Sequence, residues 1–162
     1  MKQAISRTPF GLLGLLLVSL GLSAQTLQIM DTEGHSTTVT AAQLAKEQRL
    51  TVNVRDHDTS ANFEGVPLSA VLASAGIALG DKLRGPRLAE ALLAEASDGY
   101  KVVFALAELD PAFATREIIL ADTREGKPLD AKEGPFRIIA AGDKRAARWI
   151  RQVSSIKIVA VK

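Results

Sequence analysis

Short apolar runs separated by turn residues make up most of the chain after residue 25, and they predict strands more often than helices. Alternating or continuous apolar positions indicate strands at 26–30, 50–54, 100–104, 117–121, 136–140 and 156–161. The turn residues 31–35 come before a returning strand at 36–39. We also predict a strand at 88–96, against its helix propensity, because Asp98-Gly99 follows it and separates it from the next apolar strand.

The predicted helices are few and short. Thr40 is a suitable N-cap for a helix over 41–48, and Pro67 fits the first turn of a helix that runs to Ala75. Shorter helical turns are expected at 107–109 and 146–152, and a loop is expected between the polar residues 55–58 and Phe63. Many strands with short helices predict an α+β fold with mixed or mainly antiparallel sheets in a single domain over residues 25–162.

The first 24 residues have the pattern of a signal peptide. Lys2 and Arg7 are the only charged residues in this segment, and an uninterrupted apolar and small-residue stretch follows at 10–22. Such a stretch has the length of a signal-peptide hydrophobic region and is short for a bilayer span of roughly 20 residues. We expect cleavage after Ala24 or Ser23, a periplasmic or secreted protein, and no stable membrane span after cleavage. An uncleaved N-terminal anchor is the alternative.

Composition and charge exclude several classes of protein. The 162 residues include no cysteine, which excludes disulfides, thiolate zinc sites, iron–sulfur clusters and cysteine nucleophiles. The whole chain has 20 basic and 18 acidic residues, and the first 24 residues contain two of the basic ones and no acid. Cleavage therefore leaves 18 of each and a net charge of zero, which does not favour nucleic-acid binding.

Candidate chemistry is limited to a few polar clusters, because no phosphate loop, nucleophile elbow or His-Glu-x-x-His motif occurs. His57 lies between two aspartates, but neighbouring side chains of a strand point to opposite faces, and a zinc site would also need His35. Tyr100 ends an Asp-Gly-Tyr turn and is either a ligand contact or a half-buried aromatic. The basic run 144–151 surrounds the only tryptophan, Trp149. It is either an anion-binding segment or an exposed basic face with Trp149 in the core.

An ordered series of short segments resembles the molybdopterin-binding domain of the sulfite oxidase family. The segments are Phe63-Glu-Gly-Val-Pro-Leu68, Ala75-Gly-Ile77, Asp98-Gly-Tyr100, Ile119-Leu-Ala121, Gly126-Lys-Pro-Leu129, Gly134-Pro-Phe-Arg137, Arg148-Trp-Ile150 and Ile156. The resemblance covers about residues 48–160, and it rests on the order and spacing of these segments together. It implies an α+β fold with mixed sheets and a domain that holds a molybdenum cofactor, in a family that oxidises sulfite or reduces oxidised sulfur compounds.

The chain departs from the family pattern at the metal ligand. The resemblance implies a molybdenum-ligating cysteine after the strand at 50–54, where this chain has Arg55-Asp56-His57-Asp58. Arginine and aspartate do not replace a soft thiolate ligand. No catalytic and no metal-binding residue is therefore predicted. The candidate cofactor-binding residues are Arg55, His57, Tyr100, Arg137, Lys144 and Arg148.

Three functional hypotheses follow. The leading one is an exported, non-catalytic relative of the family that acts as a binding or accessory module for a small anion or an envelope protein. It expects no cofactor, and molybdopterin enters through the resemblance alone. The second is a molybdopterin-dependent oxidoreductase that keeps the cofactor without a cysteine, through Arg137, Lys144 and Arg148. The third is a zinc-dependent site built on His35 and His57.

Overall fold

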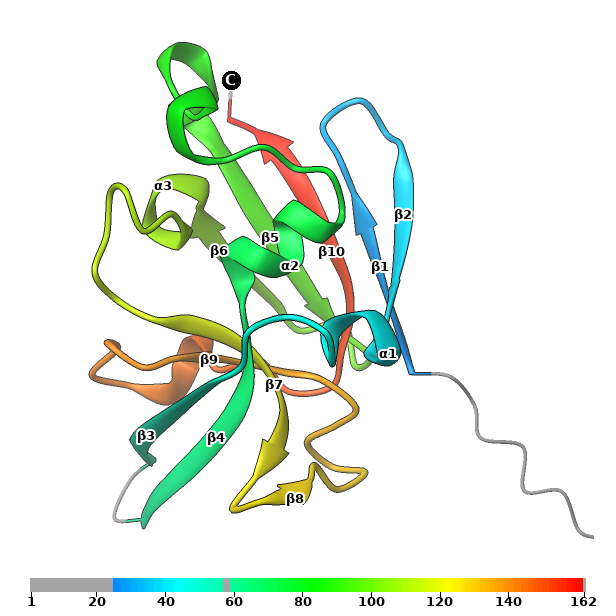
Figure 1. Ribbon diagram of the computed structural model, residues 1–162, viewed down its shortest axis with the longest axis vertical. Helices are drawn as coiled ribbons and strands as arrows, with labels where there is room; N and C mark the ends of the chain where they lie inside the picture. Colours follow the sequence, from blue (N-terminus) through cyan, green and yellow to red (C-terminus); the bar gives the residue numbers. More distant parts are fainter. Residues whose placement is uncertain (1–24, 57–58, 162) are drawn as a thin grey trace, which may run out of the picture.

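Strand pairing organises the chain into two sheets. The computed structural model describes residues 25–56 and 59–161. The strands are β1 Thr26–Met30, β2 Ser36–Thr40, β3 Leu50–Asp56, β4 Thr59–Pro67, β5 Glu90–Ala96, β6 Lys101–Ala105, β7 Ile118–Arg124, β8 Lys127–Pro128, β9 Arg137–Ala140 and β10 Val153–Ala160. One sheet has the order β2-β1-β10-β5-β6, and the other has the order β3-β4-β7-β8 with β9 also paired to β7. Figure 1 shows the first sheet in the upper part of the molecule and the second below it.

The first sheet is mixed and the second is antiparallel, which agrees with the prediction of mixed or mainly antiparallel sheets. β1 pairs with β10 in parallel, and the remaining strand pairs are antiparallel. The α-helices are α1 Ala41–Leu44, α2 Leu68–Ser74 and α3 Leu106–Leu109, and 3-10 turns occupy Gly80–Lys82, Gly85–Ala89 and Ala146–Arg148. The predicted α+β fold class is confirmed. Within the described residues, no helix has the length and apolar character needed to span a membrane.

Several local predictions are confirmed because their causes lie within a few residues. The Thr40 side chain accepts a hydrogen bond from the Gln43 N–H, and the Gln43 side chain accepts one from the Thr40 N–H, which completes a capping box. Most of the strand predicted at 88–96 is confirmed as β5, which begins at Glu90 and pairs antiparallel with β6. Gly99 in the connecting turn has φ +85°, a conformation that favours glycine.

Three local predictions are wrong. Residues 59–62, predicted as a loop, belong to strand β4, because β3 and β7 pair with this strand on both sides and Ala61 and Phe63 alternate into the core. The helix predicted at 41–48 ends at Leu44; shorter i→i−3 hydrogen bonds follow. Arg49 then forms an ion pair with Asp122 of β7 and directs the chain into β3. Only residues 146–148 of the predicted segment 146–152 are helical, as a 3-10 turn.

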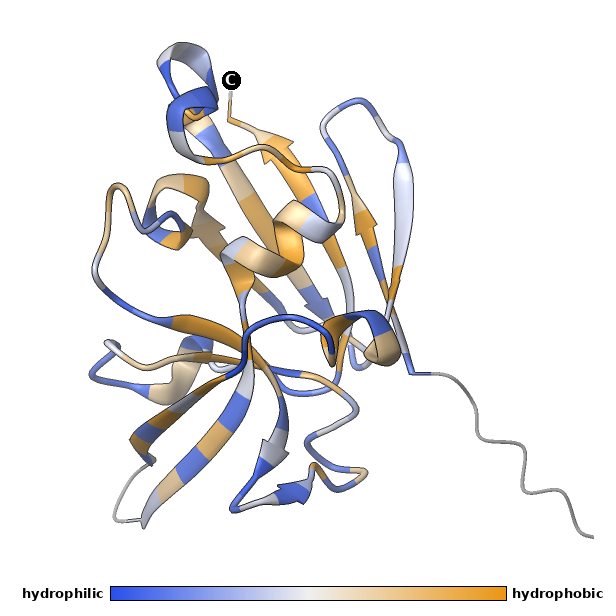
Figure 2. Ribbon diagram, in the orientation of Figure 1, coloured by the Kyte–Doolittle hydropathy of each residue, from blue (hydrophilic) through white to orange (hydrophobic). Residues whose placement is uncertain are grey.

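The core lies on the inner faces of both sheets. Its largest side chains include Phe63, Phe104 and Phe136, each no more than 2% exposed. The first four residues of β7 are all buried, which confirms the prediction from the continuous apolar run in this segment. Figure 2 shows this part of β7 as hydrophobic, whereas hydrophobic and hydrophilic residues alternate along β3 and β4. β3 and β4 therefore have one apolar face and one polar face.

Gly65 allows β4 and β7 to approach each other closely at a β-bulge. The register of the pair shifts between Glu64 and Gly65. A Cβ atom at Gly65 would lie 2.1 Å from the carbonyl oxygen of Leu120 and 2.5 Å from the Cα of Ala121. Both are backbone atoms of a buried strand, so they cannot move aside without disturbing the sheet.

We predict that Gly65→Ala lowers the free energy of unfolding by about 3 kcal/mol, because the added methyl group overlaps backbone atoms. Urea denaturation followed by circular dichroism measures this change. Ser60→Ala on the exposed part of the same strand is the control, with an expected change within about 0.5 kcal/mol. Equal stability of Gly65→Ala and the wild type would contradict the close approach.

Candidate functional site

A groove with a volume of about 1120 Å³ separates β3 from the segment that follows β9, residues 141–151. Asn53, Val54 and Arg55 of β3 form one wall. The other lining residues are Glu133, Arg137, Ala141, Asp143, Lys144, Arg145, Ala146, Ala147, Trp149 and Arg151. In Figure 1 the segment after β9 (orange) lies on the same side of the molecule as β3. The fold thus brings together two polar stretches that are about 90 residues apart in the sequence.

The groove has an excess of positive charge, carried by four exposed cations. They are Arg55, Lys144, Arg145 and Arg151. Among the described residues, no ion pair involves any of the four. Among the described residues of the groove lining, the two carboxylates, of Glu133 and Asp143, both form ion pairs with arginines. The groove therefore presents a positive surface whose field is not neutralised by its own acids.

Arg137 lines the groove but is only 5% exposed. Its guanidinium donates a hydrogen bond to Glu133, which also accepts one from Arg124 at 3.1 Å. The guanidinium carbons of Arg137 and Arg124 lie 5.0 and 5.4 Å from the ring centroid of Phe63. Arg137 is thus held in place by a carboxylate and an aromatic face, and it adds positive charge from beneath the groove surface.

Arg148 joins the segment after β9 to α3. Its Nε and one terminal nitrogen donate to the two carboxylate oxygens of Asp143, both at 2.8 Å, and its other terminal nitrogen donates to Glu108 at 3.0 Å. Its guanidinium carbon also lies 4.7 Å from the ring centroid of Phe104. The hydrogen bonds from Arg148 lower the pKa of Asp143 below its usual value. Arg148 therefore shapes the wall of the groove and does not line it.

Trp149 forms the apolar part of the groove wall. It is 4% exposed, and its Nε1–H donates to the carbonyl oxygen of Ala140 at 2.9 Å. This agrees with the interpretation that placed Trp149 in the core with the basic residues exposed around it. A buried ring behind exposed cations keeps water away from one side of a bound anion, which strengthens its attraction to them.

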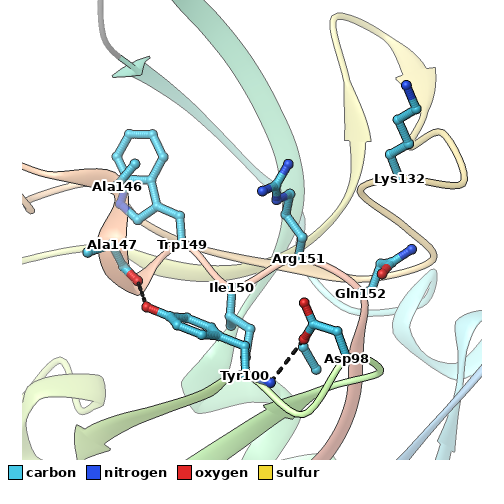
Figure 3. Close-up of a pocket in the computed structure, with 10 residues that line it drawn as sticks. Asp98, Tyr100, Lys132, Ala146, Ala147, Trp149, Ile150, Arg151 and Gln152 are labelled. Carbon is cyan, nitrogen blue, oxygen red and sulfur yellow. Dashed lines mark hydrogen bonds between the residues drawn. The ribbon is translucent and has the colours of Figure 1, made fainter.

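A second hollow of about 570 Å³ adjoins the groove and shares four lining residues with it. The shared residues are Ala146, Ala147, Trp149 and Arg151. Tyr100 is 52% exposed, and its hydroxyl donates to the Ala147 carbonyl oxygen at 2.8 Å. Figure 3 shows the Tyr100 ring reaching Ala147 while the Arg151 side chain points away from it. Tyr100 therefore supports the segment that separates the two hollows.

The structure brings some of the six candidate residues together. Arg55, Arg137 and Lys144 line the groove, and Tyr100 lines the adjoining hollow. Arg148 lies in the ion-pair cluster with Asp143 and Glu108. His57 lies outside the described residues, so neither its candidate role nor the zinc hypothesis that joins it to His35 is tested. The imidazole Nδ1 of His35 is 2.9 Å from Asp31 in the turn between β1 and β2.

Asn53, Arg145 and Arg151 also line the groove, and they are not among the six candidate cofactor-binding residues, although both arginines lie in the basic run 144–151. The high density of basic residues at 144–151 is a signal for the two arginines. Nothing in the sequence points to Asn53, because its place in the groove comes from the tertiary contact between β3 and the segment after β9.

The groups around the groove suit an oxyanion and do not suit a molybdenum ion bound through the protein. The groove presents guanidinium, ammonium and amide groups, and its carboxylates are held in ion pairs. The described residues contain no cluster of three histidine, cysteine or acidic side chains that could hold a metal, and the whole chain has no thiol. A phosphate or carboxylate matches these donors, whereas a soft metal centre does not.

Comparisons with known proteins agree with the resemblance noted in the sequence. A family model described as "Oxidoreductase molybdopterin binding domain" matches residues 14–162. No curated protein matches the chain. Among solved structures, the sulfane dehydrogenase SoxCD from Paracoccus pantotrophus superposes with a TM-score of 0.64 at 18% sequence identity. That match covers 83% of this chain and 38% of the SoxCD chain, so the likeness concerns the fold and this chain spans well under half of its neighbour.

We predict that Asp143→Asn lowers the free energy of unfolding by about 1–2 kcal/mol at pH 7, because it removes the charged acceptor of two Arg148 hydrogen bonds. The folded-state pKa of Asp143 lies below its unfolded value of about 3.9. Its contribution is therefore complete above that unfolded value and is lost as the pH falls through the folded-state pKa.

Urea denaturation of both proteins between pH 7 and pH 2 tests this prediction. The stability difference between the wild type and Asp143→Asn should shrink as the pH falls below about 4. The control is Asp81→Asn, an exposed acid outside any ion pair of the described residues, which should show a small difference at every pH. A difference for Asp143→Asn that does not change with pH would contradict the assignment.

Proposed function

Since the chain belongs to the oxidoreductase molybdopterin-binding domain family, we propose that it binds a ligand on this fold without the molybdenum chemistry. It acts as a non-catalytic binding or accessory module that holds an anionic ligand in the cationic groove. The observation that carries this proposal is the charge of the groove, where four exposed cations face one hollow and both lining carboxylates are already in ion pairs.

The geometry of the groove supports an anion with several oxygen atoms. Arg55, Arg145 and Arg151 each present a planar guanidinium that can donate two parallel hydrogen bonds to a carboxylate or phosphate. Lys144 adds a point charge on a flexible stem. The groove volume of about 1120 Å³ exceeds what a single inorganic ion needs, so the ligand is an organic anion or part of a larger molecule.

The side chains around the groove support a binding role over a catalytic one. General base catalysis needs a group that can accept a proton within reach of the ligand, most often an imidazole or a carboxylate. Among the described residues that line the groove, the carboxylates of Glu133 and Asp143 are occupied by arginines, and none is a histidine. Arginine stays protonated at neutral pH and cannot accept a proton. The chain also has no thiolate for the metal chemistry of the family.

The proposal places this module in the bacterial envelope, either periplasmic or secreted. Support comes from the first 24 residues, where two basic residues come before an apolar stretch of signal-peptide length. The ligand is then a small anion of this compartment or an acidic part of an envelope protein.

One observation favours a second function, that of a molybdopterin-dependent oxidoreductase. The adjoining hollow with Tyr100 and Trp149 extends the groove, and together they offer cations for a phosphate and aromatic rings beside it. In this alternative Arg55, Lys144 and Arg145 would hold the phosphate of the organic cofactor, which would supply the redox chemistry. The metal would have no cysteine ligand from this chain.

We predict that the mature protein, purified from a host that makes the cofactor, contains neither molybdenum nor pterin in stoichiometric amounts. Elemental analysis measures the metal, and the fluorescence of the oxidised pterin measures the organic part. About one molybdenum per chain would contradict the non-catalytic role and support the oxidoreductase.

We also predict that the protein binds inorganic pyrophosphate in the groove. The double variant Lys144→Glu with Arg145→Glu should bind about tenfold more weakly, because it replaces two attractive charges by repulsive ones. Isothermal titration calorimetry at fixed ionic strength measures the dissociation constant. Lys46→Glu with Lys127→Glu, two exposed lysines outside the groove, is the matched control and should change the affinity by less than about twofold. Equal loss in both double variants would refute a specific site.

A further inference from the structure

We propose that the ligand of the groove is an extended acidic segment of a partner protein, which adds as a strand to the free edge of β3. This inference rests on the proposed function, because it takes the groove to be an anion site and names the kind of anion. It would place the backbone of the segment against β3 and its carboxylates against the four exposed cations.

β3 lies at the end of its sheet. β3 is the end strand of the order β3-β4-β7-β8, and its only strand partner among the described residues is β4. An end strand presents backbone N–H and C=O groups that can pair with another chain. The edge of β3 runs along the groove, since Asn53, Val54 and Arg55 form one of the groove walls.

Three residues of β3 direct their backbone groups outward, away from β4. The Asn62 N–H donates to the Glu125 side chain at 2.6 Å, and the Asn62 carbonyl accepts from the Glu125 N–H at 2.9 Å. The backbone of Asn62 therefore faces β7, so Asn62 and its partner Asn53 form a non-hydrogen-bonded pair of the β3–β4 ladder. The backbone N–H and C=O of Asn53 consequently point away from β4.

Backbone groups of successive strand residues point to opposite edges, so the residues two positions before and after Asn53 face the same way as Asn53. Thr51 and Arg55 also direct their backbone groups to the open edge. Within the part of the chain that the structure describes, no hydrogen bond reaches the backbone groups of Thr51, Asn53 or Arg55 from outside the ladder. A strand placed about 4.8 Å from β3 would satisfy them and lie in the groove.

The positive charge of the groove favours an acidic strand at the open edge of β3. Every second side chain of an added strand would point to the same face, so carboxylates at alternate positions could meet Arg55 on one wall and Lys144 or Arg145 on the other. A second copy of β3 is disfavoured as the occupant, because pairing two β3 edges would bring two cationic grooves together. An acidic strand satisfies both the open edge and the excess of positive charge.

The other end strands lack this combination. β2 and β6 end the first sheet and the two-residue β8 ends the second, and no residue of these strands lines the cationic groove. Arg137 of β9 lines the groove but forms an ion pair with Glu133. Among the described strands, β3 therefore combines an open backbone edge with a groove-lining cation outside any ion pair of the described residues.

The test uses a fluorescein-labelled heptapeptide in which glutamate alternates with valine, measured by fluorescence anisotropy with the mature protein. Two control peptides are matched to it. One has lysine in place of glutamate, and the other keeps glutamate but carries an N-methyl group on every backbone nitrogen, so that neither of its edges can donate. We expect the glutamate peptide to bind, the lysine peptide not to bind, and the N-methylated peptide to bind at least fivefold more weakly than the parent, since a methylated nitrogen cannot donate and its bulk hinders strand pairing.

Variants of β3 test the same contact from the protein side. Asn53→Pro removes an outward N–H without touching the β3–β4 ladder, whereas Asn53→Ala keeps that N–H and loses only the 2.8 Å side-chain hydrogen bond to Asn62. Asn53→Pro should weaken the glutamate peptide about fivefold, and Asn53→Ala should change it less than twofold. Thermal melting shows whether each variant is folded, and the N-methylated peptide tests the contact on the unmodified protein.

The outcomes separate this inference from the proposed function. If pyrophosphate binds and competes with the glutamate peptide, and the N-methylated peptide binds weakly, both statements are supported. If pyrophosphate binds but the glutamate peptide does not, or binds as well with a methylated backbone, the strand-addition inference is overturned and the anion site stands. If neither pyrophosphate nor the peptide binds, both statements are overturned.

Discussion

The salt bridge between Arg148 and Asp143 determines both the shape and the charge of the groove. It fixes the segment after β9 through two hydrogen bonds of 2.8 Å, and a third hydrogen bond to Glu108 ties that segment to α3. It also occupies the acids that would otherwise neutralise the nearby cations, and Arg116 approaches the same two carboxylates. Lys144 and Arg145 are left exposed as a result. Arg148 thus neutralises Asp143 and Glu108, and the nearby cations Lys144 and Arg145 are available to a ligand.

The parts of the fold that depend on neighbouring residues could be predicted, and those that depend on distant partners could not. The turn at Asp98-Gly99 identified β5 in spite of its helix propensity, because a left-handed glycine between two apolar arms acts locally. β4 was missed, since its polar residues and Gly65 have the composition of a loop. Pairing on both sides makes this segment a strand, and the missing side chain of Gly65 is what lets β7 approach.

The same distinction applies to the site. The basic run 144–151 indicated one wall of the groove from composition alone. The opposite wall comes from β3, and no spacing in the sequence shows that Arg55 faces Lys144 across a hollow. Nor does the sequence show that Arg148 is taken up by ion pairs, because one of its partners, Glu108, lies 40 residues away. Residues of the same type therefore differ in role through tertiary contacts that composition does not encode.

The replacement of one kind of side chain at the end of β3 changes what the fold can do there. By its resemblance to the family, the chain should have a metal-binding cysteine directly after the strand at 50–54, and it has a polar stretch that begins with Arg55. An arginine at this wall contributes a fixed positive charge and planar donors, which hold oxyanions but cannot ligate a soft metal. The outward backbone groups of β3 are open along the groove. The same strand that would present a metal ligand in the family is then suited to recognise an acidic chain by its edge and its charge.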